Sequence, residues 1–303
     1  MLFLTIIATL VWSTTAQASN IENSMIESES QEFEQYIEQN VVTYDEYEVI
    51  QDLRYKDDNE LVELGYSKET IDQIKSDELE QTLRKEIMER AEMSVQELKN
   101  LGYSDEKIHV LKSLTGEESL EELSARGVFA TLSCSAEFLN HYYKTASNTT
   151  FMLAKFSWEW SEGTLVALTD GAAVGWNHDF AMNNNLSSLY NKHKIIYINT
   201  QDSSDVYTVT NIMEEVELNC SIDKFGVAQY QGKTQYFAKK GSGIIALSQT
   251  GKVENVKFVF KYGHNTVLAD ISLSAPFGVG FGLSGVEETY TSGVKNHASP
   301  DIM

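Results

Sequence analysis

The chain has 303 residues, of which 45 are acidic and 23 basic, giving a formal net charge of −22. This acidic balance disfavours nucleic acid and anionic lipid as partners, because both carry negative charge. The length allows one large domain or two of ordinary size.

The first eighteen residues predict an export signal. An apolar run from Leu2 to Trp12 is followed by Ala16 and Ala18, small residues at the positions that signal peptidase reads, so we expect cleavage before Ser19. The run departs from the usual pattern because no Lys or Arg precedes it. The alternative is a membrane anchor, which needs ~20 apolar residues. We therefore expect a secreted chain with no stable transmembrane anchor.

Charge and composition divide the chain. Between Ile21 and Ala125 there are 29 acidic and 10 basic residues, so the rest of the mature chain is nearly neutral. Such a break predicts segments of different character. We expect a signal peptide at residues 1–18, an acidic stretch that is flexible or partly helical at 19–54, a helical domain at 55–126, a β-sandwich at 127–294 and a polar tail at 295–303.

A repeated motif predicts the helical domain. Glu60–Ile71 recurs as Glu97–Ile108, and both copies contain Leu-Gly-Tyr-Ser. Gly65 and Gly102 suit the left-handed residue that ends a helix, and the following Ser suits the N-cap of the next helix. Ser94 with a Glu three residues later predicts a capping box. The motif therefore predicts short helices joined by tight corners, in a small acidic bundle.

The second half changes to a period of two residues. From Met152 to Trp160, apolar side chains alternate with polar ones, and the same pattern recurs at residues 256–262 and 267–273. Stretches in which apolar and polar side chains alternate, separated by turns of Gly, Asn and Ser, are typical of antiparallel strands. The predicted fold class is therefore α+β in two segments, with an acidic N-terminal helical bundle followed by an all-β antiparallel sandwich.

Several short motifs carry a resemblance to known proteins. The two Leu-Gly-Tyr-Ser hairpins are followed by Phe156-Ser-Trp-Glu-Trp160, Ala173-Val-Gly-Trp176 and Lys261-Tyr-Gly-His264. Together they resemble a group of uncharacterised secreted proteins of Gram-positive bacteria. The resemblance implies Gram-positive-type export and a two-part organisation, and it implies no activity.

One cluster is a candidate catalytic site. His178 follows Trp176 and lies between Asp170 and Asp179 in sequence, so an imidazole could act as a base that a carboxylate orients. A hydrolase would need this kind of arrangement. The alternative is a surface loop with a structural Trp. The sequence contains neither a His-Glu-x-x-His zinc motif nor a Gly-x-Ser-x-Gly elbow.

Two further groups are candidate binding residues. Trp158, Trp160 and Trp176 are candidates for a platform on which a sugar stacks, although strand aromatics on an apolar face more often belong to a core. Asp202 and Asp205 on one predicted loop could donate oxygen ligands to calcium. Two carboxylates on a loop also arise by chance. We expect no other cofactor.

The chain has two cysteines, Cys134 and Cys220. In an exported protein such a pair is expected to form a disulfide. The alternatives are two buried thiols or one catalytic thiolate.

Three functions remain open. The first is a secreted, non-catalytic protein that binds an extracellular surface, a glycan or another protein. The second is a secreted hydrolase with a dispersed site near His178. The third is a membrane-active toxin or bacteriocin-like protein, in which a segment such as Lys194 to Met213 rearranges into a β-hairpin.

Overall fold

The computed structural model describes residues 42–63, 66–165, 169–177, 179–183, 189–217, 219–253, 256, 258–264 and 301–302. All of them belong to one compact unit, Val42–Met303. The predicted signal peptide, His178, Gly65 and the predicted strand at residues 267–273 lie outside the described residues.

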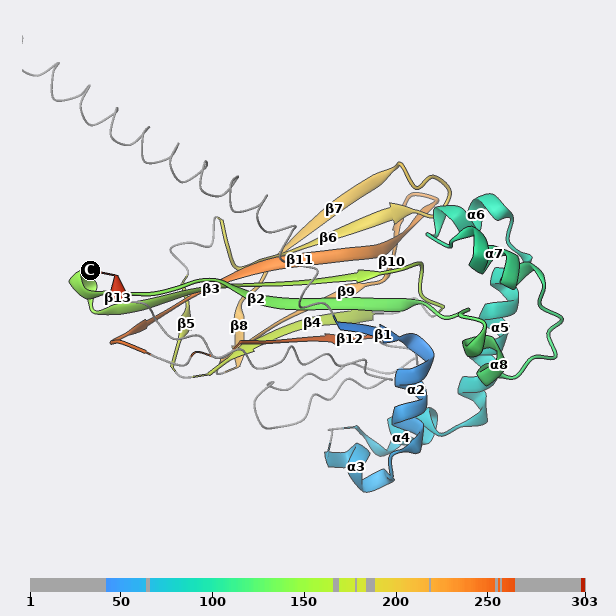
Figure 1. The fold of residues 1–303 in the computed structure, drawn as a ribbon, viewed down its shortest axis with the longest axis horizontal. Helices are drawn as coiled ribbons and strands as arrows, with labels where there is room; N and C mark the ends of the chain where they lie inside the picture. Colours follow the sequence, from blue (N-terminus) through green and yellow to red (C-terminus); the bar gives the residue numbers. More distant parts are fainter. Residues whose placement is uncertain are drawn as a thin grey trace, which may run out of the picture. The chain divides into compact units, whose positions relative to one another are not determined.

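Strands are the largest part of the described chain, and they form two β-sheets (Figure 1). The first sheet has the order β1, β2, β3, β11, β6, β7, and its strands are Val42–Asp45, Thr131–Lys144, Thr149–Trp160, Thr234–Thr250, Lys192–Asn199 and Val206–Ile212. Three short strands join it: β5 (Ala181–Met182) and β10 (Ala228–Gln231) pair with β11, and β13 (Asp301–Ile302) pairs in parallel with β2. The second sheet has the order β12, β4, β9, β8, with strands Phe258–Gly263, Thr169–Trp176, Cys220–Gly226 and Glu215–Glu217.

The strands form because alternate side chains share one apolar core. Along β3 every second residue from Thr150 to Trp160 is buried, which is the alternation that the sequence predicts. Rings from the two sheets meet in that core: Phe156 stacks on Phe260 with centroids 5.0 Å apart, and Trp158 stacks on Phe225 at 5.2 Å. Such pairs contribute ~0.5–1.5 kcal/mol each beyond the burial of their area.

Seven short α-helices lie between β1 and β2 in the chain. They are α2 (Glu46–Tyr55), α3 (Asp58–Glu63), α4 (Lys68–Ile74), α5 (Asp77–Glu92), α6 (Val95–Asn100), α7 (Asp105–Lys112) and α8 (Leu120–Ala125), and a 3₁₀ turn, η2 (Thr145–Ser147), joins β2 to β3. Among the helices described here, none is long and apolar enough to cross a membrane.

The repeated motif folds as its residue types require. The predicted capping box at Ser94 is confirmed, and Gly102 has the predicted left-handed backbone with φ of +94°. In both copies the Tyr after the Gly donates its N–H to a carbonyl five residues earlier, Tyr66 to Leu61 at 3.0 Å and Tyr103 to Leu98 at 3.1 Å. This bond is the signature of a Schellman ending.

The predicted fold class is nevertheless wrong. The described chain is mostly β, and its helices do not form a clear N-terminal bundle. Their apolar side chains share one core with Val128, Phe129, Leu165 and Phe237 from the strands and the segments next to them. Six of these seven helices have only six to ten residues, and α5 has sixteen, so most of them are too short to be stable alone. Packing against the β residues, in addition to packing against one another, therefore stabilises them.

Candidate functional site

Strands β6 and β7 form a hairpin at one edge of the first sheet (Figure 1). Their pairing runs from Lys192 opposite Ile212 to Ile198 opposite Val206. On its other side β6 pairs with β11, whereas β7 pairs only with β6 among the described strands. The segment Lys194 to Met213 is therefore a hairpin already in the folded protein.

The two faces of this hairpin differ. Ile195 and Tyr197 on β6 are buried, and Tyr207 and Val209 opposite them pack against the same core. The outward side chains of β7 are exposed, and all are β-branched: Val206, Thr208, Thr210 and Ile212. Val206 is 52% and Ile212 66% exposed.

Strand β7 also lacks the usual protection of an edge strand. Natural edge strands are blunted by charged side chains, by proline or by great shortness. The seven residues of β7 include neither a charge nor a proline. An uncharged, exposed edge marks this strand as an interaction surface.

A partly buried polar network anchors the hairpin to the second sheet. Asp223 on β9 accepts from the Asn211 amide at 2.9 Å and bonds the Nδ1 of His193 at 2.7 Å. Nε2 of His193 lies 3.0 Å from Nε1 of Trp158. Since an indole N–H only donates, Nε2 accepts and Nδ1 carries the proton. The indole thus occupies the nitrogen that a general base would need, so the Asp–His pair here is structural.

Asp170 belongs to a second buried network. It accepts from the hydroxyl of Tyr262 at 2.5 Å and lies 2.9 Å from Nδ1 of His264. Tyr262 in turn accepts from Nε1 of Trp160 at 3.0 Å, and Nε2 of His264 lies 3.4 Å from Oε1 of Glu46. All five side chains are buried. Burial and the neighbouring Asp170 carboxylate raise the pKa of Tyr262 well above its usual value.

The network joins the first turn of α2 to both sheets. Sequence reasoning placed Asp170 beside His178, whereas the structure places it beside His264. In the sequence, His264 stands out only as the last residue of the motif Lys261-Tyr-Gly-His264. Nothing in the sequence marks Glu46 as a site residue, because it is one of many acidic residues in its segment.

The other aromatic and acidic candidates are not brought together. Trp158, Trp160 and Trp176 are all buried in the core, and Trp176 donates Nε1–H to the carbonyl of Phe180 at 2.8 Å. A sugar could stack on these indoles only if the sheets separated. Asp179 is exposed.

The two cysteines lie in different sheets. Cys134 is on β2 and Cys220 on β9, both are buried, and these two described thiols form no disulfide. The structure therefore corresponds to the thiol alternative, with neither sulfur at a surface where substrate could reach it.

Asp202 and Asp205 shape the turn between β6 and β7. Oδ1 of Asp202 accepts from the backbone N–H and hydroxyl of Ser204, at 3.0 and 2.7 Å, which lowers the Asp202 pKa. Oδ2 of Asp205 accepts from Asn199 and Tyr236. Within the part of the chain that the structure describes, no group of three His, Cys, Asp or Glu side chains is placed to hold a metal ion.

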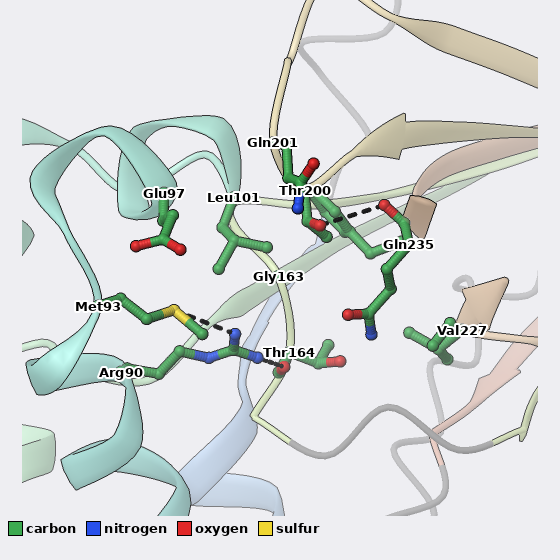
Figure 2. Close-up of a pocket in the computed structure, with 12 residues that line it drawn as sticks. Arg90, Met93, Glu97, Leu101, Gly163, Thr164, Thr200, Gln201, Val227 and Gln235 are labelled. Atoms are coloured by element: carbon green, nitrogen blue, oxygen red, sulfur yellow. Dashed lines mark hydrogen bonds between the residues drawn. The ribbon is translucent and has the colours of Figure 1, made fainter. Parts of the chain in front are cut away.

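A cavity of about 220 Å³ with a mixed polar and apolar lining lies between α5, α6 and the strands (Figure 2). Arg90 donates to the carbonyl of Thr164 at 2.9 Å, and its other terminal nitrogen contacts Sδ of Met93 at 3.8 Å. Glu97 accepts from the backbone of Ser94 at 2.7 Å. Both charged side chains of the lining thus hold local structure. The cavity is smaller than the ~300–1,000 Å³ of typical ligand pockets.

Comparisons with known proteins do not assign this chain to a family. The sequence matches no protein-family model and no curated protein. Among solved structures it is similar to Clostridium perfringens delta-toxin, at 8% identity over 44% of this chain and 73% of that chain, with a TM-score of 0.17. A TM-score that low does not establish a shared fold.

Proposed function

We propose that this is an exported, membrane-active protein that acts through the β6–β7 hairpin. The observation that carries the proposal is the composition and place of that hairpin. Residues 195–200 and 206–213 contain no charged side chain, and the hairpin lies at a sheet edge. If it leaves β11, its apolar inward face is exposed to water, which makes lipid the favourable environment.

The inward face of the hairpin has enough large apolar side chains to favour its transfer into lipid. Ile195, Tyr197, Tyr207 and Val209 line it. Each large apolar side chain moved from water into hydrocarbon contributes ~1.5–3 kcal/mol. Strand backbone in lipid also needs hydrogen-bond partners. Hairpins of several copies would therefore have to pair with one another.

The contact between β6 and β11 is suited to release. The register between the strands shifts between Ala238 and Lys240, so the ladder is interrupted there. Gly241 and Gly243 of β11 lie opposite Ile195 and His193. Glycine contributes no side chain of its own to a cross-strand pair, and the neighbouring Trp158, Phe156 and His193 side chains fill the space beside these two positions. Release would begin at this interruption and would break the bonds of His193 and Asn211 to Asp223, while β2, β3 and β11 stay paired.

Charge favours a neutral membrane as the target. The net charge of −22 opposes adsorption to anionic lipid. Uncharged zwitterionic vesicles are accordingly the first membrane to test.

A reversible tether tests the proposal. Lys194 and Ser242 lie directly opposite each other on β6 and β11. Opposite Cα atoms in an antiparallel pair are ~4.5–5.5 Å apart, within the range that a disulfide spans. With Cys134→Ala and Cys220→Ala as background, Lys194→Cys with Ser242→Cys should not release dye from vesicles when oxidised. Reduction should restore release.

The matched control shares one of the two positions. Ser157 lies opposite Ser242 on the other side of β11, so Ser157→Cys with Ser242→Cys ties β3 to β11 and leaves the hairpin free. That oxidised variant should release dye as the background protein does. Release by the oxidised β6–β11 variant, or no release by the untethered protein, would overturn the proposal.

A non-catalytic interaction protein is the second candidate, and the exposed edge of β7 favours it. An extended segment of a partner could add to that edge as a further strand. Binding to a partner without any release of vesicle contents would support this function over the first.

A further inference from the structure

We propose that β7 pairs with β7 of a second copy, antiparallel about a two-fold axis through Val209, so that two first sheets become one continuous sheet. The inference goes beyond the proposed function, because it concerns the protein in water without lipid.

The sequence of β7 is symmetric in residue type. It reads Val-Tyr-Thr-Val-Thr-Asn-Ile from Val206 to Ile212. In an antiparallel pair centred on Val209, Thr208 lies opposite Thr210 of the second copy, and Val206 lies opposite Ile212. A two-fold interface requires such self-complementarity, because each residue meets its counterpart twice.

The exposed side chains fit this pairing. Val206, Thr208, Thr210 and Ile212 point to the same, exposed face. Apolar pairs and Thr–Thr pairs across antiparallel strands are favourable, and like charges are not. On this face the interface would contain two apolar pairs and two Thr–Thr pairs, and the whole paired segment would contain no charge.

The flanking charges fix the register. Asp205 precedes the strand, and Glu214 and Glu215 follow Met213 shortly after its end. A slip that moves the centre from Val209 to Thr210 sets Asp205 opposite Glu215, which places like charges together. A slip that moves the centre from Val209 to Thr208 shortens the paired segment. A slip that moves the centre to a point between two residues sets outward side chains of one copy against inward side chains of the other.

A second copy therefore fits this edge better than an arbitrary partner. The nearest basic side chains, Lys192 and Lys194, lie on β6 opposite Ile212 and Thr210, one strand away from the proposed interface. The interface is small, so we expect a weak dimer of the class that buries less than ~1,200 Å².

Charge exchange at two exposed positions tests the dimer. The variant Thr208→Lys with Thr210→Lys sets lysines against lysines in both pairs that flank Val209. It should raise the dissociation constant about tenfold or more in sedimentation experiments without lipid, since ~1.4 kcal/mol of repulsion gives that factor. Mixing it with Thr208→Glu plus Thr210→Glu should restore a dimer that contains one chain of each variant.

Thr43→Lys is the matched control. Thr43 is exposed on β1, at the opposite edge of the same sheet. It should leave the dimer unchanged. A native protein that is monomeric at its highest soluble concentration, or lysine variants that dimerise normally, would overturn the inference. In the first case a segment of the same chain or a different partner is the occupant of the edge. Because no lipid is present, this result is independent of the vesicle experiment.

Discussion

The first sheet contains two ladders built from the same alternation, one central and one at the edge. Strands β2 and β3 pair from Leu132 opposite Trp160 to Lys144 opposite Thr149, with the second sheet packed on the apolar face of β3. Strands β6 and β7 pair over a shorter length, and β7 ends the sheet in the described chain. The position of a strand in the sheet, more than its sequence, therefore decides whether its backbone is available for partners.

The buried polar networks repeat this contrast. The network around Asp170 is fully buried and joins α2 to both sheets. The network around Asp223 holds the hairpin, and the Asp223 side chain is 10% exposed. Water can therefore reach the edge network and substitute for a lost partner more readily than it can in the centre.

The largest effect is expected from Asp170→Ala. The change leaves Tyr262 and His264 buried without their shared acceptor, and breaking a buried pair of this kind costs about 3–5 kcal/mol. Urea unfolding should show that loss. Asp223→Ala should cost less, because the Asp223 side chain is itself 10% exposed, so water can take the place of the lost carboxylate. Equal losses for the two variants would remove the contrast between centre and edge.

A smaller effect is expected from Gly243→Ala on β11. A Cβ at Gly243 would lie 2.4 Å from the carbonyl oxygen of Lys192 and 2.6 Å from the Phe156 ring, so β6 must shift. Overpacking of this kind costs about 1–3 kcal/mol. Hydrogen exchange should become faster in β6 and β7 and remain slow in β2 and β3. Ser242→Ala, at the neighbouring residue, should change stability by less than about 0.5 kcal/mol.

Local patterns predicted the local structure well. The alternation in β3, the capping box at Ser94 and the left-handed Gly102 all follow from short-range chemistry, and the structure confirms each. The segment that the toxin hypothesis singled out, Lys194 to Met213, is a hairpin because its apolar alternation suits two paired strands.

Long-range contacts were not predictable from the same patterns. The 3.6-residue period indicates helices but not what covers them, so the shared core with Phe237 was missed. Asp170 and His264 are 94 residues apart, and nothing local connects them. The acidic character of the segment around Glu46 concealed a strand, β1, that precedes α2 and pairs with β2.

The smallest effect is expected outside both ladders, in the turn before α8. The backbone N–H groups of Thr115 and Gly116 donate to the Glu118 carboxylate and lower its pKa from 4.5 to about 2. A lowered pKa means that the charged form stabilises the fold above pH 4.5 and that this contribution is lost as the pH falls to about 2. Glu118→Gln should therefore lower the melting temperature near neutral pH, and the difference from the native protein should shrink on acidification. Glu117→Gln removes one negative charge from the same turn and serves as the control. A difference for Glu118→Gln that stays constant with pH would show that packing of the side chain, rather than its charge, stabilises this turn.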